Sequence, residues 1–172
     1  MLVSDTDEKK RYEAHENDED DPKYRSYLMN LVELVVPCLK IGNKGLDFGS
    51  GKSTLLSSLF REHGFQVNSY DLYFHPSHKM LQEKYDFIIM SEVIEHLRDP
   101  LQCMNQLKEL LKPAGQVFIK TKFCPKDKAT FDNWFYKRDI THVQFFNDSS
   151  FEKLLGPFLK LGEDVYRYLH MD

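Results

Sequence analysis

The sequence predicts an α/β protein in which helices cover both faces of a doubly wound, mostly parallel β-sheet. Short apolar runs typical of buried strands, such as residues 45–48 and 85–90, alternate with segments whose apolar residues recur at helical spacing. This alternation is typical of parallel sheets, because parallel neighbours are joined by crossover helices. The length of 172 residues suits one domain with its own hydrophobic core.

Two helix starts are marked in the sequence. Asp21 before Pro22 combines an N-cap side chain with proline at the first helical position, and Asp99 before Pro100 repeats this signal. We expect the first helix to end near residue 37 and the second to turn Leu101 toward the core. The other predicted elements are, in chain order, a strand at 45–48, a helix through 55–60, strands at 65–70, 85–90 and 116–120, and an antiparallel hairpin of 158–161 and 165–169.

Charge and composition disfavour several classes of protein. The net charge is −4 and the pI is near 6.0, which argues against a nucleic-acid partner. No apolar stretch approaches the ~18 residues of a membrane span, and the N-terminus lacks an apolar signal core. Three cysteines without a CxxC pair argue against disulfides and fit a reducing compartment. We therefore expect a cytoplasmic protein with no membrane partner, and the sequence predicts no particular oligomeric state.

Acidic residues are concentrated at the N-terminus. Residues 1–21 carry nine acidic and three basic side chains, a net charge of −6, whereas residues 22–172 carry +2. We therefore divide the chain into an acidic arm, 1–21, and a single domain, 22–172. The arm has so few apolar residues that we expect it to dock weakly or to become ordered only when a ligand binds.

A glycine turn, GSG (49–51), follows the first predicted strand. It is not a phosphate-binding P-loop, because Gly45 precedes Gly51 by six residues instead of five. The turn suits a nucleoside cofactor lying across the carboxyl ends of the strands, where glycine lets the backbone approach the ligand. Asp47 is placed to meet an ammonium group, and Asp71, twenty residues after Gly51, is placed to accept both ribose hydroxyls. No second nucleotide-binding half is visible, so a mononucleoside is favoured over a dinucleotide.

Several segments together resemble the class I S-adenosylmethionine-dependent methyltransferases. They are LDFGSG (46–51), YDLYF (70–74), YDFIIMSEVIEHLRDP (85–100) and LKPAGQVFIKT (111–121). RYEAHENDEDDPKYRSYL (11–28) and YKRDITHVQFF (136–146) further resemble a group of small bacterial methyltransferase-like proteins. The resemblance implies a Rossmann-like fold, methyltransferase activity and S-adenosyl-L-methionine as cofactor. It assigns cofactor binding to Asp47, Gly49, Ser50, Gly51, Asp71, Leu72, Ser91 and Glu92.

The chain departs from the family pattern in two places. Ser53 stands where the family has its third glycine, which implies a slightly altered turn. Residues 72–84 separate the second strand from the third, and this length is too short for a helix–strand–helix crossover, since a helix alone takes about 10 residues. We therefore expect the family's usual third strand to be missing, which leaves six strands. Adenine contacts would then come from elsewhere, with residues 72–74 as the candidate loop.

The motif EVIEH (92–96) combines residues that suit a metal. If it forms one helical turn, Glu92, Glu95 and His96 share a face on which two carboxylates and an imidazole could bind Mg²⁺ or a similar divalent cation. The motif resembles metal-binding ones in small-RNA 2′-O-methyltransferases and ubiquinone-pathway O-methyltransferases. In the RNA enzymes a later histidine completes the site, and His142 is the candidate here. In the alternative, Glu92 contacts the cofactor, Glu95 and His96 pack, and His142 or His96 is the catalytic general base.

Residues 122–146 are rich in aromatic side chains, so we expect them to form a substrate wall or lid. Tyr12 and His15 of the arm are candidates to cover the cofactor if the arm folds back. Together these features predict a methyltransferase that O-methylates a small-molecule acceptor. Two alternatives stay open: a module that binds the cofactor without turnover, and a metal-dependent RNA 2′-O-methyltransferase.

Overall fold

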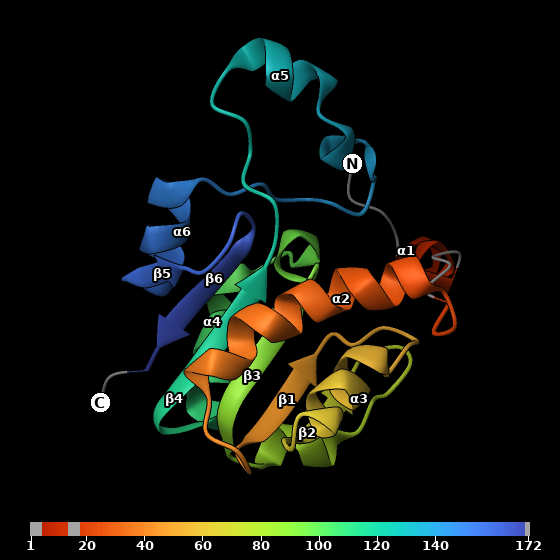
Figure 1. The fold of residues 1–172 in the computed structure, drawn as a ribbon. Helices are drawn as coiled ribbons and strands as arrows, with labels where there is room; N and C mark the ends of the chain where they lie inside the picture. Colours follow the sequence, from red (N-terminus) through yellow and green to blue (C-terminus); the bar gives the residue numbers. More distant parts are fainter. Residues whose placement is uncertain (1–4, 14–17, 171–172) are drawn as a thin grey trace.

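The computed structural model describes residues 5–13 and 18–170, which build a sheet of six strands between two layers of helices (Figure 1). The strands are β1 (Lys44–Phe48), β2 (Gln66–Tyr70), β3 (Tyr85–Ser91), β4 (Leu111–Lys120), β5 (Phe158–Lys160) and β6 (Val165–Leu169). Their order across the sheet is β2-β1-β3-β4-β6-β5. The first four strands are parallel, and β6 is antiparallel to both β4 and β5. The predicted fold class is confirmed, including the antiparallel C-terminal strands.

Four of the helices are divided between the two faces of the sheet. The helices are α1 (Asp5–Glu13), α2 (Pro22–Val35), α3 (Leu55–Glu62), α4 (Pro100–Leu110), α5 (Lys128–Asn133) and α6 (Asp148–Leu155). Short 3₁₀ turns are η1 (Val36–Cys38), η2 (His78–Gln82), η3 (Ile94–His96) and η4 (Phe135–Arg138). α2 and α3 pack on one face, where Leu31 and Phe60 join a buried cluster with Phe87 of β3. α4 and α6 pack on the other face through Met104 and Phe151.

The two marked helix starts form as predicted. The carboxylates of Asp21 and Asp99 cap α2 and α4 by accepting backbone N–H groups of the first turn at 2.9 and 2.8 Å. The expectation for Leu101 is wrong, because its side chain is 52% exposed. The face of α4 that meets the sheet carries Met104 and Leu107, and Leu101 lies to the side of it.

The connection between β2 and β3 contains no further strand or α-helix. Between residues 71 and 84, all of which are described, the chain forms only the turn η2 and an isolated bridge between Asp71 and His75. No strand is inserted there, so β2 is the edge of the sheet. The predicted six-stranded arrangement is therefore confirmed.

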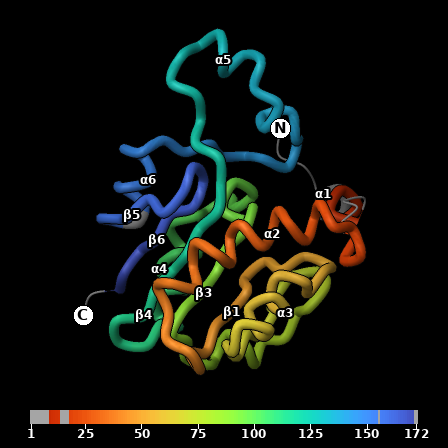
Figure 2. The backbone as a smooth tube through the Cα atoms, in the orientation of Figure 1, coloured from red at the N-terminus to blue at the C-terminus, as the bar shows by residue number. Residues whose placement is uncertain are grey.

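Residues 121–147 leave the sheet and return to it. Figure 2 shows the chain rising from the end of β4, forming α5 and η4 away from the sheet, and coming back to α6. Among the described residues, no helix combines the length and the apolar character that crossing a membrane would need.

The described part of the acidic arm contacts the domain at more points than its composition led us to expect. Arg11 forms an ion pair with Asp139, with 3.2 Å between Nη2 and Oδ2. Farther along the arm, Glu19 Oε1 accepts hydrogen bonds from the Ser53 hydroxyl and the Thr54 backbone N–H, both at 2.9 Å. Residues 14–17, which include His15, lie outside the described residues.

Candidate active site

A cleft of about 700 Å³ opens at the carboxyl ends of β1, β2 and β3. Open parallel sheets bind ligands at the carboxyl ends of their strands, where the connections that follow two neighbouring strands lead to opposite faces of the sheet. All of the residues assigned to cofactor binding from the sequence line this cleft, namely Asp47, Gly49, Ser50, Gly51, Asp71, Leu72, Ser91 and Glu92. Both candidate histidines, His96 and His142, line it as well.

The glycine turn after β1 adopts a backbone conformation that suits glycine. Gly49 and Gly51 have φ angles of 76° and 66°, in the left-handed region that other residues rarely adopt. A Cβ atom on Gly49 would lie 2.6 Å from a side-chain methyl of Val93. The N–H groups of Gly49 and Ser50 both donate to the carbonyl of Tyr70, at 2.8 and 3.1 Å. The turn is thereby fixed against the ends of both β2 and β3.

The carboxylate of Asp71 organises the other side of the cleft. It accepts hydrogen bonds from the backbone N–H groups of Gly51, Tyr73 and Phe74 at 2.9, 2.8 and 3.0 Å. A carboxylate has about four acceptor positions, so roughly one remains for a ligand. Asp71 therefore fixes the glycine turn and the loop of residues 72–74 in position relative to each other.

Asp47 is the buried carboxylate of the cleft. Its side chain is only 2% exposed, and Oδ2 accepts a hydrogen bond from the Ser57 hydroxyl at 3.0 Å. Burial raises the pKa of Asp47 from 3.8 to about 7, because the charged form loses its hydration. A cation bound beside Asp47 would lower its pKa and so favour the ionised carboxylate.

The EVIEH motif does not form the single helical turn that we expected. Glu92 is the first residue after β3 and has a left-handed φ of 54°, and the 3₁₀ turn η3 begins only at Ile94. The backbone N–H of Glu92 donates to the carbonyl of Lys120 at 2.9 Å, which keeps Glu92 at the end of the sheet. Glu92 lines the cleft, whereas Glu95 is fully buried beneath it.

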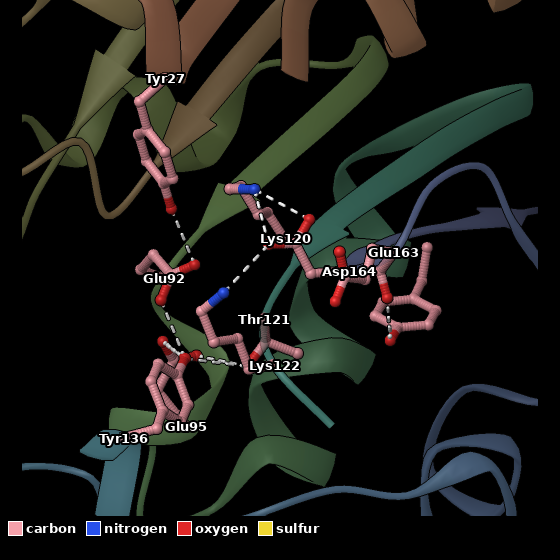
Figure 3. Close-up of polar contacts among 10 residues, drawn as sticks. Tyr27, Glu92, Glu95, Lys120, Thr121, Lys122, Tyr136, Glu163 and Asp164 are labelled. Atoms are coloured by element: carbon pink, nitrogen blue, oxygen red, sulfur yellow. Dashed lines mark hydrogen bonds and ion pairs between the residues drawn. The ribbon is translucent and has the colours of Figure 1, made fainter. Parts of the chain in front are cut away.

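A tyrosine joins the two carboxylates of this motif. The Tyr136 hydroxyl lies 2.9 Å from Glu92 Oε2 and also contacts Glu95 Oε1, and the Thr121 hydroxyl donates to Glu95 Oε2 at 3.0 Å (Figure 3). A phenol has one proton to donate, so it serves one of the two carboxylates at a time. Burial and the neighbouring charge of Glu92 raise the pKa of Glu95.

The two histidines stand next to each other with their rings fixed by backbone carbonyls. His96 Nδ1 lies 3.1 Å from the carbonyl of Thr141, and His142 Nδ1 lies 2.7 Å from that of Tyr136. Because a carbonyl only accepts, Nδ1 carries the hydrogen in both rings. Glu95, His96 and His142 each offer a ligand atom, and these atoms lie within 4.8 Å of one another. Glu92, the fourth predicted metal ligand, is not a member of that group.

The aromatic residues of 122–146 are not among the residues that line this cleft. The cleft-lining residues of this segment are Asp139 and His142, and none of its seven large aromatic side chains lines the cleft. Phe123 and Phe146 pack with the domain core, and Trp134 packs within the segment itself. These contacts hold the segment in place, and its role as a substrate wall or lid stays a prediction.

Three residues that contact the two glutamates, Tyr27, Thr121 and Tyr136, were not predicted from the sequence. Tyr27 was visible as a tyrosine on the apolar face of the first helix, and Tyr136 as a member of the aromatic segment. Neither pattern distinguishes a polar contact from ordinary packing, because both depend on residues distant in the chain. The contact from Tyr27 to Glu92, for example, spans 65 residues.

The sequence of this chain matches a known protein family. The methyltransferase domain family matches residues 20–157. Ubiquinone biosynthesis O-methyltransferase of Salmonella enteritidis PT4 is 30% identical over 104 residues, which covers 46% of this chain and 43% of that protein. The chain thus spans less than half the length of this relative.

Solved structures of methyltransferases have a fold similar to that of this chain. One is 1,6-didemethyltoxoflavin-N1-methyltransferase of Burkholderia thailandensis, solved with 1,6-didemethyltoxoflavin and S-adenosylhomocysteine. It has a TM-score of 0.68 at 12% identity and covers all of this chain and 92% of its own. A SAM-dependent methyltransferase of Archaeoglobus fulgidus has a TM-score of 0.61 at 18% identity, over 79% of this chain and 70% of its own. The chain belongs to the methyltransferase domain family and has the Rossmann-like fold of class I S-adenosylmethionine-dependent methyltransferases.

Proposed function

We propose that the chain binds S-adenosyl-L-methionine in this cleft and transfers its methyl group to an oxygen atom of a small molecule. The observation that carries the proposal is that three separate motifs, after β1, β2 and β3, converge on one cleft. A protein of similar fold adds support, since 1,6-didemethyltoxoflavin-N1-methyltransferase was solved with the small molecule 1,6-didemethyltoxoflavin and S-adenosylhomocysteine. Oxygen is favoured because the curated relative is an O-methyltransferase.

The cofactor is proposed to lie across the strand ends with its charges matched to the cleft. The ribose would use the remaining acceptor position of Asp71, and the adenine would rest near Leu72, which is 64% exposed at the rim. The α-ammonium group would meet Asp47 beneath the glycine turn. Asp47 and Glu92 both line the cleft, and the cofactor carries two positive groups, an ammonium and a sulfonium.

The acceptor is proposed to enter at the opposite end, beside His96, Arg98, Asp139 and His142. Methyl transfer from a sulfonium needs in-line positioning and, for a hydroxyl acceptor, removal of a proton. His142 is the favoured base, because its Nδ1–H is held by the Tyr136 carbonyl and Nε2 can then accept a proton. His96 is the second candidate for this role.

Calorimetric titration with S-adenosylhomocysteine tests cofactor binding. The Asp71→Ala variant is expected to lose affinity by about 100-fold, because three hydrogen bonds to a charged group, each worth on the order of 1.5–3 kcal/mol, hold the turn and loop together. Asp71→Asn keeps one acceptor oxygen and should show a smaller loss. Asp20→Ala, an exposed acid of the arm, is the matched control. Absence of binding by the natural sequence would overturn the proposal.

Turnover is tested with S-adenosylmethionine labelled in its methyl group. Label should move to compounds in a small-molecule fraction of a cell extract and not to purified RNA. Cofactor binding without any labelled product would favour the binding module, and labelled RNA 3′ ends would favour the RNA 2′-O-methyltransferase.

A metal-dependent reaction is a second candidate, favoured by the grouping of Glu95, His96 and His142. The imidazoles fit a metal, because histidine ligands commonly donate Nδ1–H to a backbone carbonyl. Glu95 fits less well, since both of its oxygens are engaged by Tyr136 and Thr121. A bound divalent cation would acidify an acceptor hydroxyl. Titration of chelator-treated protein with Mg²⁺ and Mn²⁺ tests this, and methyl transfer that is unchanged by excess chelator would exclude it.

A further inference from the structure

Glu92 is held from several directions at the middle of the cleft. It follows β3, which lies between β1 on the cofactor side and β4, whose continuation leads to the acceptor side. Its φ of 54° is uncommon for a residue other than glycine, and such a conformation persists only where the surroundings enforce it. The backbone bond to Lys120 is one such constraint. The carboxylate is therefore oriented before any ligand binds.

Tyr27 of α2 is the cleft-lining residue that holds the outer oxygen of this carboxylate. Its hydroxyl donates to Glu92 Oε1 at 3.0 Å, on the opposite side of Glu92 from Tyr136 (Figure 3). Partial burial, and after it the charge of Glu92, raise the pKa of Tyr27, so the phenol stays a donor. Tyr27 itself lines the cleft.

The ring of Tyr27 is fixed in turn by a buried ion pair. Lys120, at the end of β4, is only 5% exposed, and its Nζ lies 4.7 Å from the centre of the Tyr27 ring. The same Nζ contacts both carboxylate oxygens of Asp164, at 2.9 and 2.8 Å. A buried ammonium needs such a partner, so Asp164 holds Lys120 beneath the ring.

This series of contacts reaches beyond the cleft. Asp164 lies in the turn between β5 and β6, and its carbonyl accepts the backbone N–H of Thr121 at 3.0 Å. Neither Lys120 nor Asp164 is among the residues that line the cleft. A series of contacts thus connects the turn between β5 and β6 to the cleft through Lys120 and Tyr27.

We propose that Tyr27 is a positioning residue that holds the Glu92 carboxylate toward the sulfonium of the bound cofactor. This inference rests on the proposed function, and it predicts how the site distinguishes substrate from product. S-Adenosylmethionine carries a positive sulfur, whereas S-adenosylhomocysteine has a neutral thioether. A fixed carboxylate near the sulfur stabilises the first and not the second, so the product is released more readily.

The test is a double-mutant cycle on the affinities for S-adenosylmethionine and S-adenosylhomocysteine, measured by calorimetry. Tyr27→Phe keeps the ring on Lys120 and removes only the hydroxyl. Loss of a hydrogen bond to a charged group should weaken S-adenosylmethionine binding by about tenfold and S-adenosylhomocysteine binding by less than about threefold. Glu92→Gln should likewise weaken the binding of S-adenosylmethionine more than that of S-adenosylhomocysteine. Tyr27→Phe should have no further effect in the Glu92→Gln background, because one residue acts through the other.

Two further variants complete the experiment. Lys120→Met should reduce the preference for S-adenosylmethionine in the same direction as Tyr27→Phe. Tyr168→Phe, on β6 and outside the cleft, should leave both affinities unchanged. If Lys120→Met fails to fold, the cycle of Tyr27 and Glu92 decides alone.

Equal losses for the two ligands, or additive effects of Tyr27→Phe and Glu92→Gln, would overturn the positioning role. A natural protein that binds neither ligand would instead refute the proposed function.

Discussion

Replacing Asp47 by asparagine is expected to stabilise the unliganded protein at neutral and higher pH while weakening its binding of cofactor. The two residues have nearly the same shape, and the asparagine Oδ1 can still accept the Ser57 hydroxyl. What changes is the buried charge. In the natural protein this side chain is 2% exposed and has no cation bonded to it among the described residues. The substitution therefore separates the cost of burying a carboxylate from the packing of the turn.

The magnitude follows from the pKa of Asp47, which burial raises from 3.8 to about 7. A folded pKa above the unfolded value means that the protonated side chain contributes stability below pH ~4, and that this contribution is lost as the pH rises to about 7. The difference between a pKa of 3.8 and one of about 7 corresponds to at most about 4 kcal/mol of stability. The variant has no such loss, so its advantage in free energy of unfolding should be near zero at pH ~4 and should be complete above pH ~7.

Urea unfolding of both proteins at pH 5, 6, 7 and 8 measures this difference. The gap should widen by up to about 1.4 kcal/mol per pH unit between pH 5 and pH 7 and then stay constant. Asp86→Asn is the matched control on β3. Burial acts to raise the pKa of Asp86, but the hydrogen bonds from Lys112 and the Lys44 backbone outweigh it and lower the pKa, so that variant should lose stability. A gap for Asp47→Asn that does not change with pH would refute the reasoning.

The same site yields further predictions about binding and stability. The natural protein should bind S-adenosylhomocysteine more tightly as the pH rises through about 7, because ionised Asp47 meets the ammonium group, and calorimetry should show no such rise for Asp47→Asn. Gly49→Ala should destabilise the fold by about 2 kcal/mol or more, since its φ is positive and the new Cβ meets Val93 at 2.6 Å. Thermal unfolding measures this loss, and an unchanged midpoint would contradict the prediction. Adding Val93→Ala should restore only the stability that the steric contact costs, because the positive φ remains unfavourable. Glu19→Ala should lower the free energy of unfolding by about 1 kcal/mol, because the Ser53 hydroxyl and the Thr54 backbone N–H, just before α3, lose their acceptor, whereas Asp20→Ala should cost little.

Much of the fold could be predicted from local patterns. The N-caps of α2 and α4 and the strand–helix alternation are encoded by residues close together in the chain. The six-stranded sheet followed from counting residues 72–84, because a missing crossover is a matter of chain length. The cleft-lining residues after β1 and β2 were also identified, since parallel strands end at one edge of the sheet and the turn after β1 needs glycine.

The side-chain contacts around the glutamates were decided by tertiary structure. A helical turn from Glu92 was the reasonable local expectation, but the bond from its backbone to Lys120 keeps it in a left-handed conformation outside the turn. Tyr27 and Tyr136 reach the same carboxylate from positions 65 and 44 residues away. Local periodicity describes which side of a helix or strand is apolar. It carries no information on which hydroxyl meets which carboxylate, because that depends on how distant elements pack together.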